Sequence, residues 1–398
     1  FPQKVAARPE VLARHLAMAG REPEAIEAFE AAARLAAAQA AHAEALAHCR
    51  SALALIGKLP EGRSRLEAEM RLNVALAAQT TIVRGNAEPE VLRASERAHA
   101  AAQRLGDAKL VFRTMRGLIT FHLVRGDIGA GLTASRRLMR HVAGETDPAV
   151  LVQAHRAHGL SLLYGGRFTQ ARQELRRALD LYDPASHGAQ RFDYGSDPAV
   201  LALSHLGWVE WFLGEPERAR QHSEAAVAAA RALDHPHSLA FALAFHACLG
   251  QFLGDPAMAR AAAVETIRIA RLHDYAYWAA WGTMLQGWAM AREGDEAGGE
   301  RLLRQGLQDY AGTGAGLLRP YGLYLLAEAI AARRSAEALA LLDEALAEAE
   351  AHAIRFWRTQ TLRLRAALRD GMTQATTAPR PRRGTTRGAE GRRPPASG

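Results

Sequence analysis

Apolar residues recur every three or four positions through most of the chain, and short polar turns separate these stretches, a pattern typical of amphipathic helices. Glycines mark the turns at similar places in successive stretches. They are Gly126, Gly166, Gly214, Gly254 and Gly294, spaced by 40, 48, 40 and 40 residues. The longer step is one 40-residue unit plus eight residues, which we assign to an insertion within 183–196. This regular spacing predicts a repeat protein.

Each unit has the same parts. An apolar helix ends near the glycine, a short turn follows, and a second helix carries a small residue five positions after the glycine. These small residues are Gly131, Ala171, Ala219, Ala259 and Gly299. A small side chain there should let the paired helices approach closely. In the sixth unit, aligned at Arg334, the position is Leu339.

The pattern resembles the tetratricopeptide repeat (TPR) with longer helices. It predicts an all-α fold, namely a right-handed α-solenoid of antiparallel helix pairs with a period of about 40 residues. Residues 1–60 contain a less regular version, and residues 61–371 carry the regular repeats. A polar last helix near 355–368 should cap the stack. Residues 372–398 are rich in Pro, Gly, Thr and Arg, so we expect a disordered tail.

Two stretches, 235–254 and 275–291, are long and uncharged. A membrane helix needs about 20 predominantly apolar residues. Both stretches are in register with the repeat, and the first contains His235, His237 and Gln251. They are therefore interpreted as buried first helices of the solenoid, and no membrane contact is expected.

Composition narrows the class of protein. The chain has 398 residues, of which 49% are hydrophobic and 23% charged, which excludes a wholly disordered chain and a collagen-like chain. Only three of its 50 basic residues are lysines, a bias typical of a GC-rich bacterial genome. The net charge is +8, but the tail after Gly371 holds six arginines and one glutamate, hence +5, which leaves +3 for the body. No specific nucleic-acid partner is expected from such a distribution.

The two cysteines, Cys49 and Cys248, have neither metal-site nor redox-motif spacing, which fits a reduced cytoplasm. The chain begins at Phe1 without the pattern of a signal peptide. We therefore expect a segment of a longer polypeptide.

Catalytic and cofactor motifs are weak. The Gly57-Lys58 pair lacks the glycine and hydroxyl residue of a phosphate-binding loop. His235 and His237 flank a proline in a turn that we expect to be solvated. His155 and His158 share a helix face without a third ligand, which favours packing. We expect no catalytic, cofactor or metal site in this chain.

Three regions are candidates for partner binding. Insertions in repeat proteins often form binding loops, although this one could simply pack along the solenoid edge. A tryptophan stripe that includes Trp278 and Trp281 follows helical spacing, which most often means burial; alternatively it forms an aromatic wall for a peptide on the concave surface. Arg319 and Tyr321 open a helix after a glycine-rich turn. The full candidate set is Phe192, Asp193, Tyr194, Asp197, Trp208, Trp211, Trp278, Trp281, Arg319 and Tyr321.

Three stretches carry a more specific resemblance. They are RPEVLARHLAMAG at 8–20, LYDP at 181–184 with FDYGSDPAV at 192–200 and WVEWFLG at 208–214, and WAAWGTMLQGWAM at 278–290 with GLLRPYGLYLLAE at 316–328. Residues 1–370 resemble the C-terminal repeat region of large bacterial signalling proteins. These proteins join a class III adenylate/guanylate cyclase domain, an AAA-type ATPase domain and TPR-like repeats.

This resemblance implies a non-catalytic interaction or sensor segment. Its partners would be a protein or peptide in the concave groove and the ATPase and cyclase modules of the same polypeptide. ATP would bind only to the upstream module. Related repeats occur in ATPase-containing transcriptional regulators with LuxR-type or SARP-type DNA-binding domains, and a stand-alone TPR adaptor is a third alternative.

Overall fold

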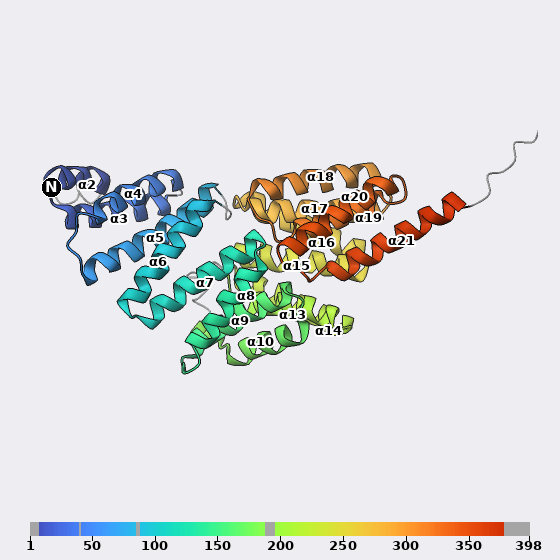
Figure 1. Ribbon diagram of the computed structural model, residues 1–398, viewed down its shortest axis with the longest axis horizontal. Coiled ribbons are helices and arrows are strands. Elements are labelled where there is room, and N and C mark those ends of the chain that lie inside the picture. The colour runs from blue at the N-terminus through green and yellow to red at the C-terminus, as the bar shows by residue number, and fades with distance from the viewer. Residues whose placement is uncertain (1–7, 40, 85–87, 188–195, 378–398) are drawn as a thin grey trace, which may run out of the picture.

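The computed structural model describes residues 8–39, 41–84, 88–187 and 196–377, and these ranges contain helices and short turns without a strand (Figure 1). The helices are α2 (Pro9–Met18), α3 (Glu22–Ala38), α4 (His42–Ile56), α5 (Arg63–Arg84), α6 (Pro89–Leu105), α7 (Ala108–Arg125), α8 (Ile128–His141), α9 (Pro148–Tyr164), α10 (Phe168–Leu181), α11 (Pro184–His187), α13 (Pro198–Phe212), α14 (Pro216–Ala232), α15 (Pro236–Leu253), α16 (Pro256–Leu272), α17 (Ala276–Arg292), α18 (Glu296–Gly312), α19 (Arg319–Ile330), α20 (Ser335–Ala351) and α21 (Arg358–Thr377).

The helices form an α-solenoid of TPR-like pairs, as predicted. The first helices of successive pairs, α7, α9, α13, α15, α17 and α19, contact one another in that order. The glycines that defined the register adopt the left-handed conformation, with φ between 69° at Gly254 and 106° at Gly294. A left-handed glycine is a common way to end a helix because it has no Cβ to clash.

The turn that leads from one pair to the next has its own left-handed residue. These residues are Asp234, Asp274, Gly314 and Ala353, with φ of 46°, 56°, 72° and 56°, and they lie 40, 40 and 39 residues apart. Aspartate tolerates this conformation better than most residues. Both corners of the unit therefore follow one period, although only the glycine corner was evident in the sequence.

The small residues at the helix crossings are buried where the pairs approach most closely. Ala171, Ala219 and Ala259 are fully buried, and a Cβ on Gly299 would lie 2.5 Å from the carbonyl oxygen of Gly287. The prediction for the sixth unit is wrong. The residue before its second helix, Arg334, follows the corresponding Asp295 by 39 positions instead of 40, so Ala338 occupies the crossing and is fully buried, while Leu339 is only half-buried.

The uncharged stretches form first helices that are buried on nearly all sides. Phe245 in α15 and Trp281 in α17 are core residues, whereas second helices such as α14 bury one face. A helix that is apolar all round belongs in a protein interior or a membrane. In the described ranges no helix is both long and apolar enough to cross a membrane.

The ends of the chain depart from the regular repeat. Helix α4 stands between α3 and α5, and small separate cores form around Phe29 and Leu46. The main core runs from Met70 into α21. Helix α21 continues to Thr377, six residues beyond the boundary predicted at residue 371, and residues 378–398 lie outside the described ranges.

Backbone hydrogen bonds connect the two ends of the main core. The Gly316 and Leu317 N–H groups donate to the Val124 carbonyl at 3.0 and 3.2 Å, and the Arg355 N–H donates to the Tyr164 carbonyl at 2.8 Å. Val124 and Tyr164 lie at the ends of α7 and α9, where helix carbonyls have no partner within the helix. We call residues 313–318 and 352–357 the closing turns, because they join segments about 190 residues apart along the chain.

Aromatic side chains fill the space behind the second closing turn. The Phe356 ring meets Tyr164 edge-on, with ring centroids 5.5 Å apart. The Trp357 ring stacks on Trp211 at 5.7 Å and on Phe252 at 4.6 Å. This turn is therefore part of the core rather than a surface loop.

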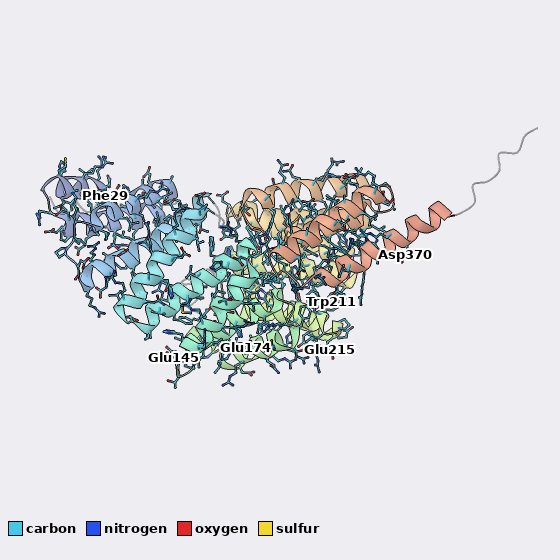
Figure 2. All side chains as sticks on the ribbon, viewed as in Figure 1. Phe29, Glu145, Glu174, Trp211, Glu215 and Asp370 are labelled. Atoms are coloured by element: carbon cyan, nitrogen blue, oxygen red, sulfur yellow. The ribbon has the colours of Figure 1, made fainter. Side chains whose placement is uncertain are left out.

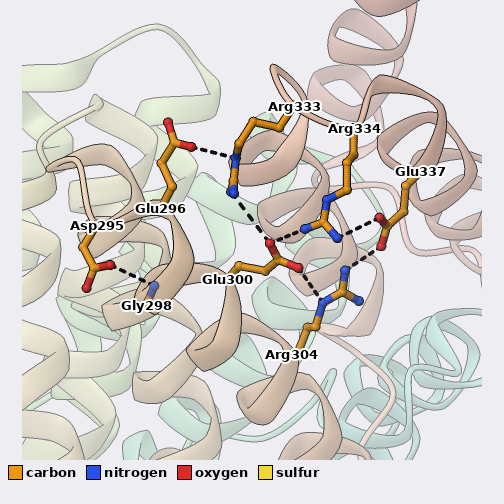
Figure 3. A network of polar contacts seen from close by, with 8 residues as sticks. All are labelled: Asp295, Glu296, Gly298, Glu300, Arg304, Arg333, Arg334 and Glu337. Carbon is orange, nitrogen blue, oxygen red and sulfur yellow. Dashed lines mark hydrogen bonds and ion pairs between the residues drawn. The ribbon is translucent and has the colours of Figure 1, made fainter.

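An ion-pair network links α18 to α20 on the outer side of the stack (Figure 3). Glu300 pairs with Arg304 at 2.9 Å and also with Arg333 and Arg334, and Arg304 reaches Glu337 at 2.5 Å. The arginines are about two-fifths exposed, so each pair adds roughly 0–1 kcal/mol of stability.

The close approach at Gly316 allows a direct test of the closing turns. A Cβ at this position would lie 2.3 Å from the Arg125 carbonyl oxygen. Gly316→Ala should therefore lower the free energy of unfolding by roughly 1–3 kcal/mol in urea denaturation. Gly312→Ala is the control, because no described atom lies within 4 Å of the place that a Cβ on Gly312 would occupy. Equal stability of the two variants would contradict a tight closing contact.

Candidate functional site

A cavity of about 280 Å³ lies on the inner side of the solenoid. The first helices α7, α9, α13, α15 and α17 each contribute residues to its wall, and Leu317 of a closing turn completes it. The repeat places these five helices next to one another, so each contributes part of its surface to the same cavity. The cavity is therefore a product of the superhelix as a whole rather than of one motif.

Aromatic rings form one wall of this inner cavity. Phe241 and Phe245 stack with centroids 4.5 Å apart, Phe245 lies 5.1 Å from Trp281, and Trp278 stacks on Trp281 at 5.3 Å. Tyr277 packs edge-on against Trp278 at 4.7 Å. Such contacts hold the rings in fixed positions and offer a rigid apolar surface to a side chain.

Hydrogen bonds orient the two histidines that line the cavity, His205 and His237. The Trp278 indole N–H donates to Nε2 of His237 at 3.1 Å, so the proton of this ring is on Nδ1, which donates to the Ser196 hydroxyl at 2.7 Å. Nδ1 of His205 donates to the Leu201 carbonyl at 2.5 Å. Burial lowers the pKa of His205 to about 3, and the nearby Arg156 acts in the same direction.

Two arginines are the charged residues of the inner cavity. Arg156 is only 5% exposed, and its Nε and Nη2 donate to Oε1 of Gln153 at 3.2 and 3.0 Å. Arg116 enters from α7. Among the described lining residues there is no aspartate or glutamate. Figure 2 shows Glu145, Glu174 and Glu215 along one edge of the molecule instead. The cavity combines an apolar wall with positive charge.

A second, larger cavity of about 520 Å³ opens between α5, α6 and α7. Its wall includes Met70, Val74, Leu110 and Arg113, and Arg116 borders both cavities. Sequence reasoning missed this cavity, because it depends on how far α5 stands from α7. No sequence motif in α5 or α7 indicates how far apart these two helices lie.

The insertion residues divide into two groups. Phe192, Asp193 and Tyr194 lie outside the described ranges. Asp197 is buried at the start of α13, where Oδ1 accepts hydrogen bonds from the backbone N–H groups of Ala199 and Val200 and Oδ2 accepts one from the Tyr182 hydroxyl at 2.7 Å. Its carboxylate is thus engaged in helix capping and in holding α10 to α13, not in a surface contact.

Four other candidates serve the fold. Trp208 is fully buried and donates to the Phe245 carbonyl, and the buried Tyr321 donates its hydroxyl to Gln251 at 2.8 Å. Trp211 stacks on Trp357, and Arg319 pairs with two glutamates of α20. These residues do not line the inner cavity. Trp208 and Trp211 stack on Phe356 and Trp357 of the second closing turn, and Arg319 and Tyr321 belong to α19, beyond the helices that line the cavity.

Trp278 and Trp281 are both buried and both line the inner cavity. Trp281 also donates its indole N–H to the Cys248 sulfur at 2.9 Å. The two interpretations of the tryptophan stripe therefore do not exclude each other. These rings belong to the core, and their inner edges form the cavity wall.

The histidine pairs are structural. His235 caps α15 by accepting a hydrogen bond from the Ser238 N–H, and His237 is half-buried against Trp278, so the expected solvated turn is wrong. Nδ1 of His155 lies 2.7 Å from a Glu174 carboxylate oxygen, and Nδ1 of His158 lies 3.0 Å from the Ser135 hydroxyl. Among the described residues, no three or more histidine, cysteine, aspartate or glutamate side chains are grouped so that they could hold a metal ion.

Comparisons with solved structures agree with this fold. The chain is similar to a Rap protein complexed with competence and sporulation factor, with a TM-score of 0.55, 12% identity, and coverage of 93% of this chain and 99% of that one. It is similar to NprR in complex with its cognate peptide NprX, with a TM-score of 0.52, 13% identity, and coverage of 81% and 91%.

A third similar structure is a signal transduction ATPase with numerous domains (STAND) that has a tetratricopeptide repeat sensor, from Pyrococcus horikoshii. Its TM-score is 0.47 at 14% identity, and the match covers 78% of this chain and 46% of that one. No protein-family model matches the sequence, and no curated protein is significantly similar to it. The similarities define the class, a TPR-like helical-repeat protein, and at these identities they show the fold alone.

The buried His205 gives the fold a pH dependence. Because its pKa falls below the ordinary value of 6.5, the unfolded chain takes up this proton more readily, and stability is lost as the pH falls below 6.5. Between pH 7 and pH 5 the loss from this residue should be about 2 kcal/mol.

Urea denaturation at both pH values of the wild type and of His205→Asn measures this loss, and the variant should show a smaller difference. His15→Asn, at an exposed position on α2, is the control. A wild-type difference no larger than that of His205→Asn would contradict the assignment.

Proposed function

We propose that this chain is a non-catalytic sensor that binds a peptide or protein segment in the inner cavity of its solenoid. The observation that carries the proposal is the cavity itself, which is lined by a rigid aromatic wall and by Arg116 and Arg156. A mainly apolar concave site with a few fixed polar groups is the usual form of a ligand pocket. Repeat solenoids provide extended concave surfaces for such binding.

The solved structures that share the fold support this choice of ligand. One was determined with competence and sporulation factor and another with a cognate peptide. Their similarity to this chain concerns the fold, so the identity of the bound peptide does not transfer. What supports a peptide here is the combination of that fold with an inner cavity.

We further propose that the segment regulates an AAA-type ATPase module and an adenylate cyclase module in the same polypeptide, in the cytoplasm. This proposal depends on the sequence resemblance at 8–20, 181–214 and 278–328. In it the chain itself is not an enzyme and binds no cofactor, and ATP binds to the upstream module. A ligand could act by favouring one of two solenoid conformations, and it shifts their populations only by its difference in affinity for them.

Filling the inner cavity tests ligand binding. Thr120 is exposed on α7 and lines the cavity, so Thr120→Trp should fill it without disturbing the core. Peptides selected from a random display library on the wild-type chain should bind this variant at least roughly tenfold more weakly, as measured by calorimetry. Thr169→Trp, at an exposed position on α10, is the control and should bind normally. Equal binding by both variants would place the site elsewhere.

The regulatory proposal has a separate test. Reading the coding sequence upstream of Phe1 in the same frame should reveal a phosphate-binding loop and a cyclase-like domain. Cyclase and ATPase rates of that longer protein should then change when residues 1–371 are removed. Unchanged rates would reject regulation by the solenoid, and a DNA-binding domain in place of the cyclase would favour the transcriptional regulator. A start codon near Phe1 would favour the adaptor.

A further inference from the structure

The two cavities are parts of one groove along α7, and we infer that the groove binds an acidic peptide in an extended conformation. This inference rests on the proposed function and specifies the chemistry of the ligand. In this groove, helix α7 determines where the peptide would lie, and the positive charge of the lining residues determines which peptides would bind.

One face of α7 borders both cavities. Leu110, Arg113 and Gly117 line the larger cavity, and Thr120 and Val124 line the inner one. These positions are spaced by three and four residues, which places them on one side of the helix. Arg116 lines both cavities, so they meet at this residue.

The groove has room for a short peptide. Leu110 and Val124 are fourteen positions apart, which is about 21 Å along the helix axis at about 1.5 Å per residue. An extended chain advances about 3.3 Å per residue, so about six residues would cover the groove. The combined space is larger than a single side chain needs.

The charge of the groove points to an acidic partner. The charged residues that line it in the described part of the chain are Arg71, Arg113, Arg116 and Arg156. Arg71 is offset by Glu30, with which it forms an ion pair. Arg113 is exposed on the groove and has no ion-pair partner within the described ranges. A carboxylate of the ligand would pair with the Arg113 guanidinium, because arginine and carboxylate match in charge and geometry.

The floor of the groove favours a peptide over a nucleic acid. It is formed by aliphatic side chains, including Val74, which is 41% exposed, together with Met70 and Leu110. Single-stranded nucleic acids are usually bound by exposed rings on which bases stack. Here the rings of the inner cavity pack on one another, and the Trp278 indole N–H is bonded to His237. The ligand is thus a peptide in which acidic residues accompany aliphatic ones.

Display selection tests the inference. Random ten-residue peptides are selected on the wild-type chain and on Arg113→Glu, and the selected pools are sequenced. The wild type should enrich Asp and Glu over the input, whereas Arg113→Glu should lose that enrichment. The best acidic peptide should bind Arg113→Glu roughly tenfold more weakly, and its Glu-to-Lys version should regain affinity for this variant.

Arg177→Glu is the matched control, because it makes the same charge change at an exposed position on the outer helix α10. Thermal unfolding followed by circular dichroism shows that each variant is folded. Selected peptides without acidic enrichment, or equal effects of both variants, would overturn the inference while the proposed peptide sensor stands. Failure to select any peptide would overturn both. Displacement of the peptide by single-stranded DNA through Arg113 would replace the acidic peptide with a nucleic acid.

Discussion

The carbonyl groups at the ends of α7 and α9 determine how the rest of the solenoid is arranged. A helix end leaves these acceptors without partners, and here backbone N–H groups of Leu317 and Arg355 supply them. The contact is possible because Gly316 brings its backbone against the Arg125 carbonyl. With this contact the inner face is enclosed, and Leu317 becomes part of the cavity wall. The site therefore depends on a backbone interaction between turns, and the side chains in the sequence do not indicate this interaction.

The charge of the inner face is determined by the surroundings of individual residues and not by a cluster of ionisable groups. His205 is held neutral by its surroundings, and His237 is held in one tautomer by the Trp278 indole and the Ser196 hydroxyl. The positive charge that remains belongs to arginines, which keep their proton at any ordinary pH. A partner that pairs with these arginines would meet positive charges that do not vary in the physiological pH range.

Local regularities were predictable from the sequence, and long-range contacts were not. The spacing of Gly214, Gly254 and Gly294 predicted the fold, because these corners adopt the left-handed conformation that glycine favours. The tryptophan stripe predicted buried rings and, in its second interpretation, a wall. The pairing of Gly316 with the end of α7, and the gap between α5 and α7, depend on superhelical curvature that accumulates over many repeats. A change of one residue in the length of a unit, such as the one that brings Ala338 to the crossing, is not predicted by a fixed period.

Solenoids generally contact only neighbouring repeats, so their units can unfold one after another from an end. The closing turns alter this behaviour. They join segments about 190 residues apart in the chain and so raise the contact order of the part from α7 to α21. A unit between these segments therefore cannot unfold without breaking the hydrogen bonds of the closing turns. The part from α7 to α21 should thus unfold as one cooperative unit. Helices α2 to α4 have small separate cores, so they should unfold independently from the end, as in an ordinary repeat array.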